Sequence, residues 1–196
     1  MKIVTKEYKI YAFNELSEEA KEKVREFYLD GQDPWFFTND CKEYLKELFP
    51  YSSLEVQYSL GYCQSDGFTV YGDIYPSEIL NHIKENFTEK EMKFFAHIFL
   101  AFGESAYKIP CPRCNSYIEQ EYLSDYLSDL EYCHYRNIPY KLIEKFEQIA
   151  NDYMDELCSN FADCGYKYFY EIDDDMLEDW CEANEYEFTA DGELFY

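Results

Sequence analysis

The sequence predicts an α+β fold, in which a small, mostly antiparallel sheet packs against several amphipathic helices. Alternating apolar and polar residues mark two hairpins, near residues 54–75 and 186–196. Apolar residues spaced three and four apart mark helices in most other stretches. Because 47% of the 196 residues are hydrophobic and 20% are aromatic, the chain has enough apolar surface for a sizeable core.

The N-terminal region predicts one short strand followed by two helices. Residues 8–13 alternate like a strand, and Ser17 then provides an N-cap for a helix over residues 18–29. The buried side of this helix would be Ala20, Val24 and Phe27 or Tyr28. After a break at Pro34, a second helix is expected over about residues 39–49.

The middle of the chain has the clearest strand pattern. Apolar residues alternate over residues 54–74 on both sides of a turn at 64–67, so a hairpin is expected. A short helix over about residues 77–87 follows. Thr88-Glu89-Lys90-Glu91 then supplies a capping box for another helix, which carries an apolar stripe toward Gly103.

The last part of the chain predicts a long helix, a strand, a short helix and a hairpin. The long helix begins beyond Pro139 and is expected to end near Gly165. A strand over residues 166–172 and a helix over residues 173–184 follow it. The final hairpin, over residues 186–196, would turn at Ala190-Asp191-Gly192.

Negative charge is concentrated toward the C-terminus. The formal net charge is −24, and residues 119–196 hold 22 Asp and Glu against four basic residues, a net of −18. The first 118 residues contribute −6. We therefore distinguish an α+β core region, residues 1–118, from a strongly acidic, helix-rich region, residues 119–196. Both are expected to pack on the same core as a single domain.

This charge indicates the kind of partner. An acidic field repels nucleic acid and anionic membranes and attracts basic surfaces, so we expect a basic protein partner and no direct binding to nucleic acid or membrane. The first seven residues lack the apolar segment of a signal peptide, and no apolar run approaches the ~18 residues of a membrane span. An intracellular protein is expected.

The candidate partner-binding residues are carboxylates on two predicted helices. They are Asp173, Asp174, Asp175, Glu178, Asp179 and Glu182, together with Asp155 and Glu156 on the long helix. Asp174, Glu178 and Glu182 would form one row whose spacing is comparable to that of phosphates on a nucleic-acid strand. Met176, Leu177 and Trp180 would form the opposite, apolar face. The row is thus a candidate DNA mimic, and the alternative is an ordinary solvated helix face.

The pattern is weakest over residues 105–135, where a short strand into Pro110 and a helical stretch from about Ile118 are expected. Cys111 and Cys114 in this stretch have the spacing of half a zinc site. The remaining ligands would have to come from Cys133, His134, Cys158 or Cys164. The alternatives are a redox dithiol and two ordinary buried thiols. We favour buried, reduced thiols and expect no metal and no cofactor.

Catalytic motifs are scarce. The chain has three histidines, and it contains no H-E-x-x-H, G-x-S-x-G, P-loop or dinucleotide-binding fingerprint. Carboxylate pairs that hold a metal for hydrolysis are conceivable among 41 acids, but no pair stands out. We therefore expect a protein that is not an enzyme, and the main alternative is a metal-dependent nuclease or nucleotide hydrolase.

Residues 11–28, 56–67 and 184–192 resemble those of a family of small acidic proteins encoded by bacteriophages and prophages, largely without assigned function. The most specific element is Tyr-Ser-Leu-x-Tyr-x-Gln-x-Asp-Gly, at residues 58–67. The resemblance implies a phage context and a place in the cytoplasm of a bacterial host cell. It carries over no catalytic residue.

Compact acidic proteins of phages often inhibit host defence systems. Together with the charge, the resemblance favours an anti-defence inhibitor of the anti-CRISPR or anti-restriction type, which binds a nucleic-acid-handling host protein as an acidic DNA mimic. The partner would be a CRISPR effector or a restriction enzyme. A third hypothesis is that the chain is an antitoxin-like regulatory partner of a phage protein.

Overall fold

The computed structural model describes residues 6–64, 66–102, 107–109 and 140–195, and the chain divides into two compact units. The terminal unit comprises residues 1–34 and 165–196, so both ends of the chain build it. The central unit comprises residues 35–164. Residues 119–196 therefore contribute to both units.

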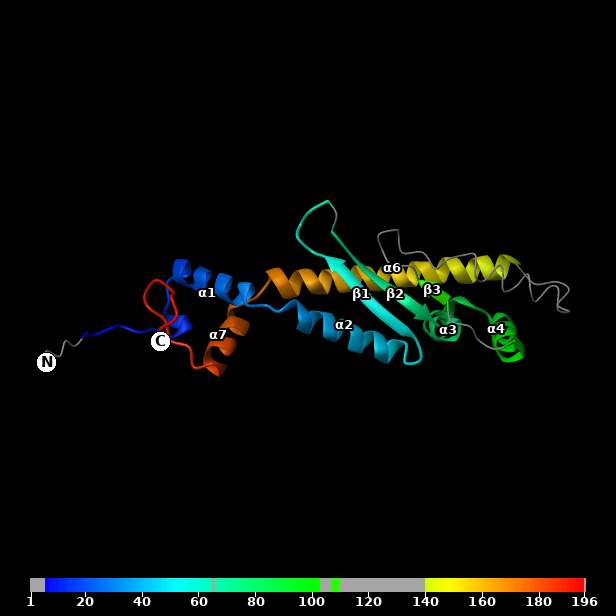
Figure 1. Cartoon of the computed structure of the whole chain (residues 1–196), viewed down its shortest axis with the longest axis horizontal. Coiled ribbons are helices and arrows are strands. Elements are labelled where there is room, and N and C mark those ends of the chain that lie inside the picture. Colours follow the sequence, from blue (N-terminus) through cyan, green and yellow to red (C-terminus); the bar gives the residue numbers. More distant parts are fainter. Residues whose placement is uncertain (1–5, 65, 103–106, 110–139, 196) are drawn as a thin grey trace. The chain divides into compact units, whose positions relative to one another are not determined.

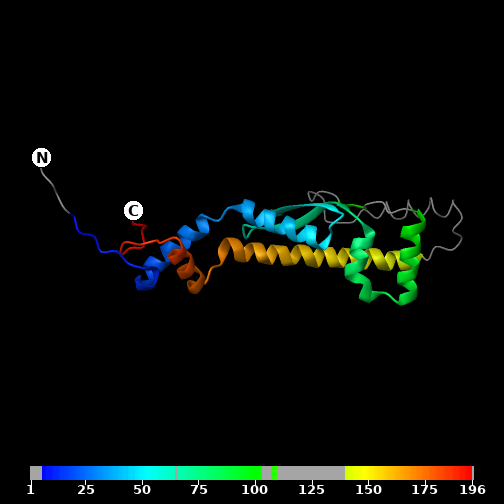
Figure 2. The ribbon, with the colours of Figure 1, turned by 90° about the horizontal axis from the view of Figure 1, so that it is seen from below.

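Two short helices build the terminal unit. Helix α1 (Glu18–Asp30) begins at Ser17, whose side chain accepts a hydrogen bond from the backbone N–H of Ala20, at 3.3 Å. Helix α7 (Asp174–Ala183) lies beside α1 (Figures 1 and 2). The short 3₁₀ helix η1 (Phe13–Glu15) precedes α1. The buried core of this unit is formed by Phe13, Leu16, Ala20, Val24, Leu177, Cys181 and Phe188.

The two chain ends meet at Phe188. Phe188 forms antiparallel bridges with Tyr11 and with Leu194. The turn between Phe188 and Leu194 is closed by a 3.0 Å hydrogen bond from the N–H of Gly192 to the carbonyl of Thr189. The C-terminal hairpin and its turn are thus present, although the pairing is a single bridge. Residues 8–13 likewise form one bridge, at Tyr11, rather than the predicted strand.

A three-stranded antiparallel sheet forms the centre of the central unit. Strands β1 (Ser53–Ser59), β2 (Gly67–Ile74) and β3 (Tyr107–Ile109) are ordered β1-β2-β3. Val56 pairs with Val70, and the hairpin predicted near residues 54–75 is confirmed. One face of the sheet is buried, through the side chains of Val56, Phe68, Val70 and Ile74.

The longest described helix is α6 (Tyr140–Tyr170), and its residues 140–164 belong to the central unit. Helix α2 (Pro34–Leu48) and α6 cover the same face of the sheet, because the ring of Phe68 contacts Phe37 of α2 and stacks on Phe161 of α6 at 5.0 Å. Helices α3 (Pro76–Ile83) and α4 (Glu89–Phe102), joined by the 3₁₀ helix η2 (Lys84–Asn86), lie near the N-terminal end of α6 (Figures 1 and 2).

The structure confirms the α+β fold and also corrects one predicted strand and the start of one predicted helix. Residues 166–170 are helical, because α6 passes through Gly165 and ends at Tyr170, so the predicted strand over 166–172 is wrong. Helix α2 begins at Pro34 instead of about residue 39. Proline lacks the N–H that the first helical turn leaves unpaired, so it can open a helix. The capping box of α4 is confirmed, with the Thr88 N–H donating to Glu91 at 2.6 Å.

Candidate partner-binding surface

Helix α7 carries most of the predicted partner-binding acids, and its sequence fixes how it lies on α1. Asp173 caps it by accepting a 2.8 Å hydrogen bond from the N–H of Met176. Leu177 and Cys181, one helical turn apart, are fully buried against the core. The remaining positions of α7 therefore form two flanks and an outward face.

One flank of α7 is held by residues of the N-terminal segment. Asp174 pairs with Arg25 at 2.5 Å and with Lys21 at 3.9 Å. The Asp174 hydrogen bond is the main cause that raises the pKa of Arg25. Glu178 accepts a 2.7 Å hydrogen bond from the side chain of Asn14. Two members of the predicted row thus stabilise the terminal unit from within.

The outward face of α7 presents the freely exposed acids. Asp175, Asp179 and Glu182 are exposed, and so is the capping residue Asp173. Asp175 and Asp179 are one turn apart, about 6 Å along the helix axis. The carboxylates best placed to meet a partner are therefore these, and of the predicted row only Glu182 belongs to them.

The other flank of α7 is aromatic and corrects the predicted apolar face. Leu177 is buried and Trp180 is half-buried, as expected, but Met176 is 59% exposed. Position 176 lies on the helix beyond the side that packs on α1, so its apolar side chain reaches the surface. Trp180 packs against Tyr28 of α1, with ring centroids 4.9 Å apart.

Asp155 and Glu156 lie on α6 within the central unit, and both are exposed. Partial desolvation of its carboxyl group, followed by the charge of Asp152, raises the pKa of Asp155. Desolvation and Glu144 raise the pKa of Glu147 on the same helix. Like charges within one turn destabilise a helix, so these two pairs of acids lower the stability of α6.

Of the two units, the terminal unit carries more negative charge per described residue. Its described residues, 6–34 and 165–195, hold 19 Asp and Glu against six Lys and Arg, a net of −13 in 60 residues. The described residues of the central unit carry −8 in 95 residues. Sequence reasoning missed the acids of α1 as partner-binding candidates. Their signal in the sequence was weak, because three basic residues stand among the five acids of residues 18–30: Glu18, Glu19, Glu22, Glu26 and Asp30.

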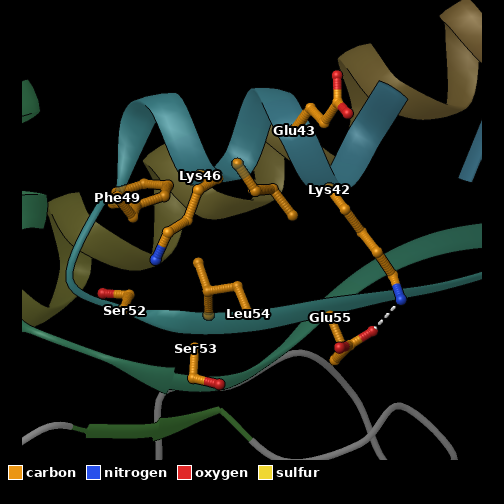
Figure 3. A pocket seen from close by; sticks show the side chains of 9 residues that line it. Lys42, Glu43, Lys46, Phe49, Ser52, Ser53, Leu54 and Glu55 are labelled. Atoms are coloured by element: carbon orange, nitrogen blue, oxygen red, sulfur yellow. Dashed lines mark ion pairs between the residues drawn. The ribbon is translucent and has the colours of Figure 1, made fainter. Parts of the chain in front are cut away.

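The central unit contains a pocket of about 310 Å³ between α2 and β1 (Figure 3). Lys42 and Glu55 form an ion pair across it. Lys46 donates a 2.6 Å hydrogen bond to the carbonyl of Pro50, and Glu43 accepts one from Asn39 at 3.0 Å. Each charged side chain that lines this pocket therefore has a partner within the chain.

The thiols that the structure describes are mostly buried and protonated. Cys41, Cys158 and Cys181 are buried, whereas Cys63 and Cys164 are exposed. Burial raises the pKa of Cys41 to about 12 and that of Cys181 to about 11. Cys111 and Cys114 lie outside the described residues, so the zinc alternative stays a prediction. Within the described ranges, no group of three or more His, Cys, Asp and Glu lies suitably placed to hold a metal ion.

Comparison of the chain with protein-family models, with curated proteins and with solved structures found no match in any of the three. In the part of the chain that the structure describes, no helix has both the length and the apolar character needed to cross a bilayer.

Proposed function

We propose that this chain is a phage-encoded inhibitor that binds a nucleic-acid-handling protein of the bacterial host in place of DNA, and so counters a restriction enzyme or a CRISPR effector. The observation that carries the proposal is the net charge of −13 in the 60 described residues of the terminal unit. The exposed carboxylates Asp175, Asp179 and Glu182 are the contacts we assign to this role.

Electrostatics favours such a partner over nucleic acid itself. A basic groove that binds DNA through Lys and Arg gains affinity by replacing counterions with phosphates, and carboxylates at similar intervals can take the place of those phosphates. A strongly acidic unit also speeds encounter with a basic surface and repels DNA. Inhibition should therefore weaken as salt is added.

The test measures competition with DNA. A purified RNA-guided CRISPR nuclease and a type II restriction endonuclease are each mixed with a fluorescent DNA substrate, and the protein is titrated at about 50 mM and about 200 mM NaCl. We expect displacement of DNA from at least one of the two, with markedly lower affinity at the higher salt. Tight DNA binding by the isolated protein, or affinity indifferent to salt, would contradict the proposal.

A matched pair of variants locates the contact. Reversing Asp175, Asp179 and Glu182 to Lys should weaken inhibition about 10-fold or more, because three exposed charges at the interface change sign. Reversing three exposed acids of the central unit changes the net charge equally and should weaken it far less. These control positions are Asp40, Glu47 and Glu85. Equal losses in both variants would show a general charge effect and no specific contact at α7.

A further inference from the structure

An exposed apolar patch interrupts the acidic surface of the terminal unit. It consists of Phe27 on α1 with Met176 and Trp180 on α7, and we call it the anchor patch. Phe27 is 48% exposed and Met176 is 59% exposed. The ring centroids of Phe27 and Trp180 are 6.1 Å apart, and Met176 precedes Trp180 by one helical turn on the same face. The patch is therefore continuous across the two helices.

Trp180 is held in place before any partner arrives. Its ring makes edge contacts with Tyr28 and with Tyr186, at centroid distances of 4.9 and 5.0 Å. A side chain that is already packed loses little rotamer freedom on binding, so its contact area converts more fully into affinity.

Exposed acids flank the anchor patch on both helices. Glu26 and Asp30 lie within one turn of Phe27 on α1, and Asp173 and Asp179 lie within one turn of Met176 on α7. All four are exposed. An aromatic and methionine centre surrounded by polar side chains is the usual anatomy of a protein interface hot spot. Simple replacement of phosphates would need no such apolar centre.

We infer that the anchor patch is the hot spot through which the terminal unit docks on a basic protein whose surface has an apolar depression edged by Lys and Arg. This inference rests on the proposed function and names the contact that holds the partner once charge has attracted it. Charge complementarity selects this occupant, because a second copy would bring the same four acids against their counterparts. The apolar part of the affinity should survive added salt, whereas the charged part should not.

The test uses two basic peptides of equal length and charge, one built of Lys and Gly and the other of Lys and Leu. Binding to the full chain is followed by the fluorescence of Trp180 in a Trp35→Phe background, which leaves one of the two tryptophans. We expect the Lys-Leu peptide to bind about 10-fold more tightly than the Lys-Gly peptide. Its advantage should grow as salt is raised, because only the charged contribution is screened.

Variants connect this preference to the patch. Phe27→Ser combined with Met176→Ser should remove the preference for the Lys-Leu peptide and leave Lys-Gly binding unchanged. If the double variant melts too early to be compared, the single variant Met176→Ser, at the more exposed position, takes its place. It should reduce the preference for the Lys-Leu peptide. Tyr51→Ser is the control, because this side chain is 81% exposed and lies in the central unit.

The outcomes separate the inference from the proposed function. If the Lys-Gly peptide fails to bind at low salt, the electrostatic basis of the proposed function is wrong, and the inference fails with it. If the two peptides bind equally, or the double variant retains the preference, the inference alone is overturned. Sedimentation that shows a dimer abolished by the double variant would assign the patch to a second copy and would also overturn it.

Discussion

Gly192 allows the C-terminal turn to pack on α1. Its φ is +84°, and a Cβ at this position would lie 2.4 Å from the carbonyl oxygen of Ala20. Gly192→Ala should therefore lower the free energy of unfolding by about 2 kcal/mol. Gly67→Ala is the matched control, since an added Cβ there meets no atom within 4 Å, and its effect should stay within about 0.5 kcal/mol. Urea denaturation followed by circular dichroism compares the two, and equal losses would contradict the argument.

Glu78 is a buried carboxylate that joins α3 to the start of β1. It accepts a 2.9 Å hydrogen bond from the N–H of Tyr51 and another from the hydroxyl of Ser52, whose oxygen in turn accepts from the N–H of Tyr75. Glu78→Ala removes the acceptor of both donors and should cost about 3 kcal/mol of stability. Glu78→Gln keeps one acceptor oxygen and should cost less, about 1 kcal/mol. Chemical denaturation of both variants measures these losses. An Ala variant as stable as the Gln variant would contradict a stabilising role for the Glu78 hydrogen bonds.

At this scale the sequence predicted which side chain of α7 is buried better than what each of its acids contacts. The helical period correctly separated Leu177 from the carboxylates. It could not show that Asp174 pairs with Arg25, because that partner lies 149 positions away in the sequence. It also placed Met176 on the apolar face, since periodicity shows which side of a helix is apolar but not how far the neighbouring helix covers it.

The acidity of α6 should make its stability depend on pH. Desolvation and Glu144 raise the pKa of Glu147 above its ordinary 4.5 in the folded state. The folded protein then binds this proton more tightly than the unfolded chain does, so stability from this group is full below pH 4.5 and is lost as the pH rises through the folded-state pKa. Glu147→Gln removes that loss, and at pH 7 it should raise Tm by about 1 °C.

The control for this effect is the same substitution at an exposed acid of α2, Glu47→Gln, which should leave Tm nearly unchanged at both pH values. Thermal melts at pH 4 and pH 7 make the comparison. Stabilisation by Glu147→Gln that is equally large at pH 4 would show a packing effect instead of an electrostatic one.

Among whole elements, capping residues predicted the starts of α1 and α4 well, whereas the start of α2 and the end of α6 were predicted poorly. Ser17 and Thr88 cap their helices as expected, because a cap is a local hydrogen bond. The strand predicted over residues 166–172 relied on the β propensity of Tyr and Phe and on Gly165 as a stop. Gly165 is buried within α6, and Tyr166 contacts Tyr170 one turn later, with ring centroids 6.2 Å apart. Such i,i+4 contacts and tertiary packing outweigh a weak propensity.

In the whole molecule, the α+β class was predictable because the spacing of apolar residues that marks a helix or a strand is visible within a short stretch of sequence. The grouping of elements into units was not, because it depends on contacts between distant segments. Phe188, for example, joins Tyr11 across most of the chain. This grouping brings the acids of α1 and those of α7 into the same unit, so the acidic surface of that unit combines residues from both ends of the chain.

The charge of the terminal unit leads to a prediction about stability. A net of −13 in 60 residues should make this unit repel itself more strongly than the central unit does. Raising NaCl from about 0.01 M to about 1 M shortens the Debye length from about 30 Å to about 3 Å, which screens that repulsion. Hydrogen exchange, corrected for the rates of unstructured peptides, should therefore slow in α1 and α7 by about fivefold more than in β1 and β2, which corresponds to about 1 kcal/mol.

The internal comparison removes the general effects of salt on burial, since both units experience the same solution. Reversing Asp175, Asp179 and Glu182 to Lys lowers the negative charge of the terminal unit by six, and it should reduce the extra slowing of exchange in α1. Reversing Asp40, Glu47 and Glu85 to Lys in the central unit should leave that extra slowing in place. Exchange that slows equally in both units would mean that self-repulsion within the terminal unit is already balanced by pairs such as Arg25 with Asp174.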